Sequence, residues 1–535
     1  MAKSYKTPGV YIEEISLFPP SIAEVETAIP AFIGYTEKAE KKDGEDLTNV
    51  PTRIKSMLEY TELFGGPNPE KNIVVNVTEI KDNSGKIVSR IIKIPKPTTS
   101  KYLMYYSLQI FFTNGGGPCF IISVGKYGDP ELVSKSDLDA SGGLGKLAKE
   151  DEPTLIVFPD ATSLGTKDNF YGVYKEALTQ CKKLQDRFTI IDTYDEGENF
   201  DKNLRDGINL VTDYLKYGAA YYPFLKTTIN YQYKEEDVTI NFLNTDTKYR
   251  LTQGDIDSLS FVPSDNQMTA LNTIKDTGYD DEAAFKTALT TALSDAGATL
   301  SETRQNEVVK AAEPAVTTKK ISEIKEINTE LYNLIKTEMN KLTVTLPPGS
   351  AMAGIYARVD SDRGVWKAPA NVGLNAVIAP DKKITNDEQD SLNVHETGKS
   401  INVIRSFAGK GTLVWGARTL AGNDNEWRYI PVRRFFNFAE ESIKKGTSWV
   451  VFEPNDANTW VRVKAMIENF LIKQWRIGAL AGAKPEDAFF VKVGLGETMT
   501  SLDILEGRMN IEIGMAVVRP AEFIILKFSH KMQEA

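Results

Sequence analysis

GRMNIEIGMAVVRPAEFIILKF, residues 507–528, is the stretch that decides how this chain folds and assembles. In its first half, large apolar residues alternate with polar or small ones. An alternation with a period of two is typical of a β-strand that buries one face. A second strand pattern, PGVYIEEI, occupies residues 8–15 near the other end of the chain. Both ends are therefore predicted to be strands, and neither has an obvious partner.

A strand at a chain terminus needs main-chain partners, either at an edge of its own sheet or at the sheet edge of another copy. Pairing within the same chain is the simpler alternative for a single terminal strand. Two such ends favour a protein that polymerises by exchanging strands. The residues predicted to take part are Val10, Tyr11, Ile12, Ile15, Met509, Ile511, Ile513, Met515, Val517, Phe523 and Ile525.

Composition excludes several classes of protein. The chain has 535 residues, which favours about three or four folded units. Its net charge of -10 argues against a nucleic-acid groove or a polybasic membrane anchor. Cys119 and Cys181 cannot form a disulfide framework, and a reducing compartment is expected. With neither a signal-peptide pattern nor a membrane-spanning apolar run, we expect synthesis and assembly in the bacterial cytoplasm.

The chain divides into segments of different character. Residues 1–24 are predicted to be an arm, and residues 25–225 an α/β domain in which apolar runs alternate with helical patterns. Its predicted strands are IPAFIGYTEKA (29–39), CFIISV (119–124), TLIVFPD (154–160) and FTIID (188–192). Between the last two, apolar residues at helical spacing from Phe170 to Leu184 predict a helix with Cys181 in the core.

Residues 226–345 are predicted to be a variable insertion that faces outward. A polar, strand-like stretch over 231–251 precedes helices whose thin apolar stripes predict a small bundle. The two stripes are Phe285, Ala288, Leu289, Ala292 and Leu293, and Ile324, Ile327, Leu331, Leu334 and Ile335.

Residues 346–506 are predicted to be a second large domain, and residues 507–535 a C-terminal strand arm. All 6 tryptophans lie after residue 345. Because large aromatics concentrate in cores and interfaces, the firmest packing and the main contacts are expected here.

Three loops resemble ligand sites but lack required residues. NGGGP (114–118) precedes a strand, whereas a phosphate loop follows one, so a turn is expected. GKGT (409–412) has Ile404 in place of the first P-loop glycine and Gly411 after the lysine. DSDRG (360–364) places its glycine too early for a calcium loop and has Asn371 where a glutamate is needed, so it too predicts a turn.

Catalytic groups do not converge in the sequence. Asp160 and Asp192 end two strands, where α/β enzymes place ligands, although such aspartates more often cap helices or form turns. The only histidines, His395 and His530, are expected on the surface. No enzyme activity, cofactor or metal is predicted. The alternative function is a nucleotide- or metabolite-binding α/β enzyme with an oligomerisation domain.

A series of strings closely resembles the contractile tail sheath family of bacteriophages and phage-tail-like injection systems. They are TPGVYIEEI (7–15), VDSDRGVWKAPAN (359–371), INVIRSFAGKGTLVWGARTL (401–420), YIPVRRFFNFAEESI (429–443), VFEPNDANTWVRV (451–463), GAKPEDAFFVKVG (482–494) and the final strand pair. Val493-Gly494 stands where family members often carry Cys-Asp. The segment 226–342 is expected to have no counterpart in the shared core of the family.

The resemblance implies a multidomain α/β (α+β) fold whose C-terminal sheath domain is completed by the arms of neighbouring subunits. It implies a homo-oligomeric mesh of stacked six-fold rings around an inner tube, which contracts to drive the tube through a target envelope. Implied partners are the inner tube protein, baseplate proteins, a tail terminator or cap and, in some systems, sheath paralogues. Nucleic acid and direct membrane insertion are not implied. The particle would be a phage tail, or an injection apparatus that is released or membrane-anchored.

The helix after Asn455 is the hypothetical contact with that tube, because of its place in the family motif. Its basic residues are Arg462, Lys464, Lys473 and Arg476. The alternative is an amphipathic core helix with solvated basic residues. A non-contractile structural subunit, such as a shell or baseplate component, also stays open.

Overall fold

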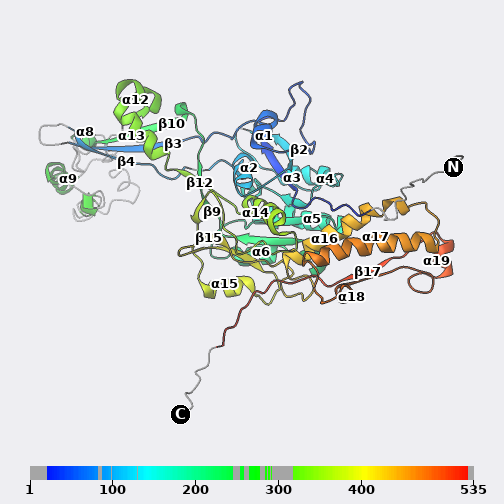
Figure 1. Cartoon of the computed structure of the whole chain (residues 1–535). Coiled ribbons are helices and arrows are strands. Elements are labelled where there is room, and N and C mark those ends of the chain that lie inside the picture. Colours follow the sequence, from blue (N-terminus) through cyan, green and yellow to red (C-terminus); the bar gives the residue numbers. More distant parts are fainter. Residues whose placement is uncertain are drawn as a thin grey trace, which may run out of the picture. The chain divides into compact units, whose positions relative to one another are not determined.

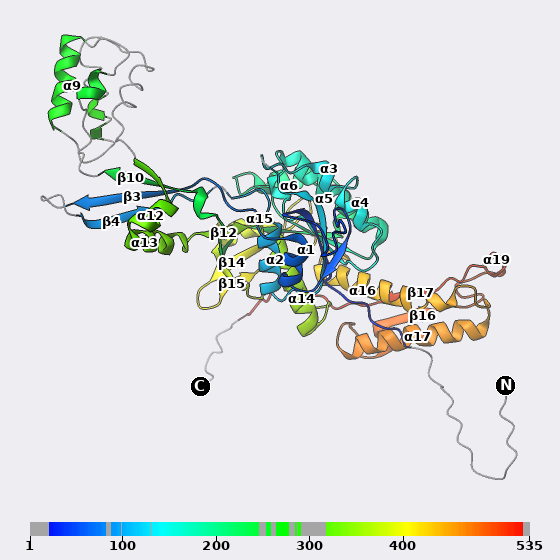
Figure 2. The ribbon, with the colours of Figure 1, turned by 90° about the horizontal axis from the view of Figure 1, so that it is seen from above.

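The computed structural model describes residues 21–81, 87–97, 99–128, 130–244, 253–257, 264–277, 284–285, 287–289, 291 and 317–527 (Figures 1 and 2). The chain forms two compact units. The large unit contains the described residues of 21–68, 101–229 and 345–527, and the small unit those of 69–100 and 230–344.

An eight-stranded sheet forms the centre of the large unit. Its inner strands run parallel, and an antiparallel strand closes each edge. In spatial order the strands are β15 (Gly411–Val414), β14 (Ile401–Phe407), β8 (Gly218–Tyr222), β7 (Phe188–Ile191), β6 (Leu155–Val157), β1 (Pro30–Thr36), β5 (Cys119–Lys126) and β2 (Thr52–Ile54). The predicted α/β fold class is confirmed.

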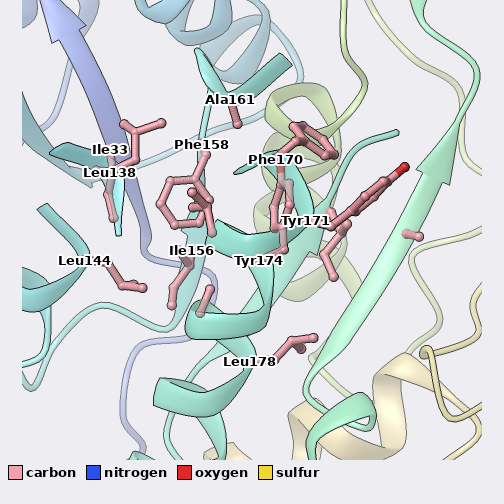
Figure 3. Packing of buried hydrophobic residues seen from close by; sticks show 14 of the residues in the cluster. Ile33, Leu138, Leu144, Ile156, Phe158, Ala161, Phe170, Tyr171, Tyr174 and Leu178 are labelled. Carbon is pink, nitrogen blue, oxygen red and sulfur yellow. The ribbon is translucent and has the colours of Figure 1, made fainter. Parts of the chain in front are cut away.

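Helices cover both faces of this sheet, which explains why its inner strands are buried apolar runs. The predicted helix over 170–184 is α5 (Lys167–Leu184), which lies on one face with α3 (Lys135–Leu138) and α4 (Gly143–Leu147). In Figure 3, Phe158 of the strand layer faces Phe170 and Tyr174 of α5; ring centroids lie 5.5 Å apart for Phe158–Tyr174 and 5.0 Å for Phe170–Tyr174. Cys181 is fully buried there, as predicted.

The other face carries α2 (Met104–Thr113) and α14 (Gly349–Arg363), which contact each other although they lie far apart in sequence. Further elements of this unit are α1 (Met57–Phe64), η1 (Ala161–Ser163), α6 (Phe200–Gly207), α7 (Thr212–Leu215), α15 (Asn386–Asn393) and the antiparallel strands β9 (Leu225–Asn230) and β13 (Val377–Pro380).

The end of the chain forms a separate layer of the same unit, called here the C-terminal layer. Helices α16 (Ile430–Gly446) and α17 (Ala457–Arg476) pack against a two-stranded antiparallel sheet of β16 (Phe489–Lys492) and β17 (Glu512–Met515), called here the β16–β17 pair. Figure 2 shows the two long helices beside these short strands. The layer also contains η3 (Ser448–Val450), α18 (Pro485–Ala488) and α19 (Ser501–Leu505).

The small unit is a four-stranded sheet with helices packed on it. Its strand order is β11 (Thr317–Lys320), β10 (Val238–Asn244), β3 (Ile73–Lys81) and β4 (Ile87–Lys93). Its helices and short turns are η2 (Glu235–Asp237), α8 (Gln253–Asp257), α9 (Asp265–Thr277), α12 (Ile321–Ile327) and α13 (Thr329–Met339), while β12 (Thr343–Leu346) spans the junction with the large unit.

Two expectations about the small unit are only partly met. Its main described core is a sheet covered by helices, while the buried residues Ile256, Leu271 and Ile274 lie on the helices between residues 253 and 277. In the second stripe, Ile324, Leu331 and Ile335 are buried, whereas Ile327 and Leu334 are 67% and 43% exposed. Asn328 ends α12 and caps α13 by accepting a hydrogen bond from the Leu331 N–H. The apolar face therefore does not continue through the break. Of the other predicted stripe, Phe285 and Leu289 are buried and Ala288 is half-buried, whereas Ala292 and Leu293 lie outside the described residues.

The observed division also differs from the predicted segments. Strand β14, from the segment 346–506, pairs in parallel with β8, from the segment 25–225, so both belong to one sheet. Residues 69–100 join the insertion instead of the α/β segment. Sequence periodicity identifies a strand but not its neighbour, because a parallel crossover can contain any length of intervening chain.

The distribution of aromatic residues corrects a third expectation. The largest fully buried aromatic side chains lie mostly before residue 225, among them Phe32, Tyr60 and Tyr174. Among the tryptophans, Trp366, Trp449 and Trp475 are only partly buried at the margin of the C-terminal layer. The firmest core is thus the eight-stranded sheet and its helices. In the described residues, no helix is long and apolar enough to cross a membrane.

Candidate assembly interface

The ends of β6 and β7, where Asp160 and Asp192 lie, are the predicted ligand site of the enzyme alternative. Asp160 is fully buried there and accepts hydrogen bonds from the N–H groups of Tyr35 (2.7 Å) and Leu103 (2.6 Å), at the start of α2. Burial raises the pKa of Asp160 to about 7, and these N–H groups limit the rise. A side chain at Gly34 would collide with this carboxylate. The Asp160 carboxylate therefore connects β1 to the start of α2 through these two hydrogen bonds.

Asp192 has the corresponding role one strand further along. Its Oδ1 accepts a hydrogen bond of 2.6 Å from the N–H of Gly349, the first residue of α14. Burial raises the pKa of Asp192 to about 7, and the Gly349 N–H limits the rise. Both aspartates thus bind the start of a helix, as a cap does. In each case the helix lies far from the aspartate in sequence, which the sequence pattern did not indicate.

The three loops that resembled ligand sites have structural roles. Gly115 follows the end of α2 with a φ of 97°, and Gly409 and Gly411 turn the hairpin between β14 and β15 with φ of 74° and 77°. The prediction of a turn at residues 360–364 is wrong, because residues 360–363 form the C-terminal end of α14. The Asp360 carboxylate binds the guanidinium of Arg434 on α16 at 2.9 and 2.5 Å, which joins two of the family-like strings.

Clusters that could hold a metal are absent from the part of the chain that the structure describes. His395 lies in a loop, where its Nδ1 is 2.9 Å from the Thr397 hydroxyl, and His530 lies outside the described residues. What remains as a candidate site is the C-terminal layer with its exposed main chain and side chains.

The β16–β17 pair presents one face to the core of its own layer. Ile511, Ile513, Met515 and Val517 pack against the core residues of α16 and α17, while Asn510, Glu512 and Ala516 are exposed. Met509 is half-buried just before this run. The predicted alternation of faces is thus present. In the described chain no third strand lies beside either member of the pair, so one edge of each strand is open to another strand.

After β17 the chain forms one isolated antiparallel bridge, between Val517 and Leu480, and in the described residues it joins no further strand. Its last main-chain hydrogen bond to the body runs from the Val518 N–H to the Ala479 carbonyl, 3.1 Å. Beyond it, Phe523, Ile524, Ile525 and Leu526 are 68–79% exposed. Figure 1 shows this segment as a red trace leaving the helices. A run of four large apolar residues in water marks a contact surface.

The N-terminal segment lies on the same layer where its description begins. Ile22 is buried among residues of α16 and α17, and the Val25 N–H donates to the Ser442 hydroxyl at 3.1 Å. Gln474 of α17 donates to Glu24 at 2.8 Å. The predicted exchange residues Val10, Tyr11, Ile12 and Ile15 lie outside the described residues.

Helix α17 is amphipathic, with Val463, Ile467 and Phe470 among its buried residues. Arg462, Lys473 and Arg476 are exposed, whereas Lys464 is half-buried and lies 4.0 Å from Glu468. The Arg462 guanidinium lies over the Trp449 ring at 4.4 Å. The helix therefore has a core face and an exposed basic face, which is compatible with both interpretations of it.

Sequence reasoning missed one constellation. Arg418, Asn393 and Tyr429 surround the carboxylate of Glu522. Arg418 and Glu522 lie in two of the family-like stretches, but they are 104 residues apart, and no spacing rule connects them.

Two family models match the chain. The phage tail sheath protein central domain matches residues 268–420, and the phage tail sheath C-terminal domain matches residues 422–531. The first match begins within the segment 226–342, so the part of this segment from residue 268 onward has a counterpart in the family model.

Curated relatives are similar over shorter stretches. The chain is 31% identical over 144 residues to the tail sheath protein of Burkholderia phage BcepMu, and 25% identical over 138 residues to the tail sheath protein of Vibrio phage KVP40. These matches span 26% and 25% of this chain and only 30% and 20% of the two relatives.

Solved structures are similar over almost the whole chain. A chain of the anti-feeding prophage baseplate, 6-fold symmetrised, is 30% identical and covers 99% of this chain and 100% of its own, with a TM-score of 0.57. The contracted helical sheath of the anti-feeding prophage is 29% identical with the same coverage and TM-score. The contracted PVC sheath complex, from an extracellular contractile injection system, is 25% identical, with 99% of each chain covered and a TM-score of 0.56.

Proposed function

The chain belongs to the contractile tail sheath family, and from this we propose that it is a structural subunit that polymerises around an inner tube and contracts to drive that tube through a target envelope. The enzyme alternative finds no support in these relatives, whose role is structural. The two aspartates that this alternative would use, Asp160 and Asp192, already accept hydrogen bonds from the starts of α2 and α14.

The β16–β17 pair is the observation that carries the proposal. It has a face packed on its own core, and no third strand lies beside it in the described chain. The exposed apolar segment 523–526 offers a strand of matching character. If one neighbour lends this segment and another lends residues 8–15, each pair becomes a four-stranded sheet shared between subunits. Main-chain hydrogen bonds provide affinity in such strand addition, and alternate side chains provide specificity.

Contraction needs connections that persist while larger contacts are exchanged. A main-chain ladder fits this need, because its bonds are local to the shared sheet and the linkers on each side can bend. We assign the role of linker to residues 518–521, between β17 and the lent segment. The body contributes rigid surfaces, whose two packing arrangements define the extended and contracted states.

The exposed face of α17 is the surface that we assign to the inner tube. Arg462, Lys473 and Arg476 make this face positive in a chain whose net charge is -10. An acidic tube surface would be attracted to it, with an association rate that falls as ionic strength rises.

The remaining partners follow from the assemblies in which similar chains were solved. Those assemblies are a helical sheath and baseplates of contractile systems. We assign to this chain six-fold sheath rings, a baseplate contact at one end and a terminator or cap at the other, with room for sheath paralogues. Assembly in the bacterial cytoplasm as part of a phage tail or injection particle completes the proposal.

Negative-stain electron microscopy tests the proposal directly. The protein, produced together with an inner tube protein of a contractile system, should form hollow striated tubes with six-fold end views. Two classes of tube, long and narrow or short and wide, are expected after partial triggering with denaturant. Tubes of a single, invariant length per ring would indicate the non-contractile structural alternative. Monomers alone, with the tube protein present, would contradict sheath assembly.

A further inference from the structure

The C-terminal segment is held to the body at one point, Glu522. Arg418 donates from Nε to Oε1 at 2.9 Å and from Nη2 to Oε2 at 2.6 Å, and the Nε–Oε2 distance is 3.1 Å. Asn393 donates to Oε1 at 2.7 Å, and the Tyr429 hydroxyl donates to Oε2 at 3.0 Å. Both carboxylate oxygens therefore have several donors in a fork geometry that is specific for a carboxylate.

The body side of this contact is rigid. The Arg418 side chain is 4% exposed, and its guanidinium also donates to the Gly422 carbonyl at 3.3 Å. Tyr429 is the residue that precedes α16, and Arg418 and Tyr429 form an isolated β-bridge. The donors are thus positioned before the glutamate arrives, which lowers the entropic cost of binding it.

Glu522 also separates the part of the chain that is bonded to the body from the part that is exposed. Among the described residues 519–527, Glu522 alone makes hydrogen bonds or ion pairs to the body. The exposed segment Phe523–Leu526 begins at the next residue. If the hydrogen bonds to Glu522 were broken, the free chain would begin after Val518, four residues earlier. The position of the exposed segment could then vary by about 14 Å.

We propose that the Arg418–Asn393–Tyr429 pocket is an anchor that positions the C-terminal segment for pairing with a neighbouring subunit. This inference rests on the proposed sheath function. Fixing Glu522 sets where the apolar segment leaves the body and in which register it reaches another copy. The anchor acts through the segment and contacts no partner itself. At neutral pH it is ready to act, because hydrogen bonds from Arg418 and Asn393 outweigh burial and lower the pKa of Glu522.

Glu522→Gln is the test, because it keeps the side-chain shape and directs an amide toward the Arg418 guanidinium. The matched control is Glu506→Gln, which removes an exposed carboxylate paired with Arg508 and changes the net charge equally. A Lys527→Cys label reports on the segment. Cys119 and Cys181 should stay unlabelled, because burial raises the pKa of both thiols.

Two readouts are needed. In dilute, unassembled subunits, a spin label at position 527 should become more mobile in Glu522→Gln than in the control, with unchanged circular dichroism and melting temperature. In assembly followed by light scattering, Glu522→Gln should be about tenfold slower or more, since a longer free tether lowers the effective concentration of the segment.

The outcomes separate the two proposals. Unlabelled wild-type protein that forms no sheath contradicts the proposed function. Wild-type sheaths together with unchanged or faster assembly of Glu522→Gln overturn the anchor alone. If Glu522→Gln does not fold, Tyr429→Phe removes one donor and should give a smaller rise in label mobility with a smaller loss of assembly rate; no change in either would also overturn the anchor.

Discussion

The eight-stranded sheet and the β16–β17 pair are both packed against helices, but their edges differ. The large sheet is covered on both faces, and short antiparallel strands, β2 and β15, end it. The pair is covered on one face, and in the described residues no third strand lies on either side of it. The large sheet is therefore stabilised by packing and pairing within one chain. The pair has unused main-chain groups, which another chain can bond.

Removing a lent strand should have the largest effect on assembly and almost none on folding. Deletion of residues 1–15 should abolish sheath formation and leave the melting temperature within a few degrees of the wild type, because the core of the large unit lies elsewhere. Electron microscopy and differential scanning calorimetry measure the two effects. Unfolding of the truncated protein would show instead that residues 8–15 pair within their own chain.

Breaking a buried contact of the large unit should have the opposite effect. Asp360→Asn removes the charge opposite Arg434, and both side chains are 5% exposed. The expected loss is about 3–5 kcal/mol in the free energy of unfolding, because the guanidinium would stay buried without its counter-charge. Urea denaturation measures it.

Glu45→Gln is the control for this loss. Glu45 pairs with Lys41 at 2.6 Å, and the two side chains are 58% and 46% exposed, so its loss should leave the free energy of unfolding almost unchanged. Equal losses for the two variants would contradict the assignment of stability to the buried pair.

Asp192 should make the large sheet sensitive to pH. Its pKa is raised to about 7 in the folded state, above its usual value of 3.8, so the folded state holds this proton more tightly than the unfolded state. Its stabilising contribution is complete below about pH 4 and is lost as pH rises to about 7. Relative to the wild type, Asp192→Asn should gain about 2–4 kcal/mol of stability over that interval. A flat difference between the two denaturation curves would contradict this.

Reversing exposed charges should have the smallest effect. Lys473→Glu with Arg476→Glu should slow co-assembly with the inner tube by about tenfold at low salt, less at high salt, and leave folding unchanged. Reversal of Lys146 on α4 and Lys183 on α5, two exposed lysines on the helices of the large sheet, is the control and changes the net charge equally. Intact co-assembly of the α17 variant would favour the alternative in which these residues are only solvated.

Local patterns in the sequence were sufficient for most elements. Alternation located the face of β17, helical spacing located α5 with Cys181 in the core, and the failed motifs at residues 114–118 and 409–412 are turns. Residues 69–100 were misplaced although Ile73, Val75 and Val77 alternate as a strand should. The pattern was present, but it could not say that β3 pairs with β10, from a segment much later in the chain.

The sequence by itself determined the family, the strand character of the pattern that forms β17, and the lack of a complete ligand motif, because these depend on residue type and short-range spacing. The tertiary structure alone decided which distant groups meet. Asp160 and Asp192 accept hydrogen bonds at the starts of α2 and α14. Asp360 pairs with Arg434, and Glu522 pairs with Arg418. Such contacts require chain reversals over tens to hundreds of residues, and the free energy that selects them comes from burying whole layers together, which no local pattern encodes.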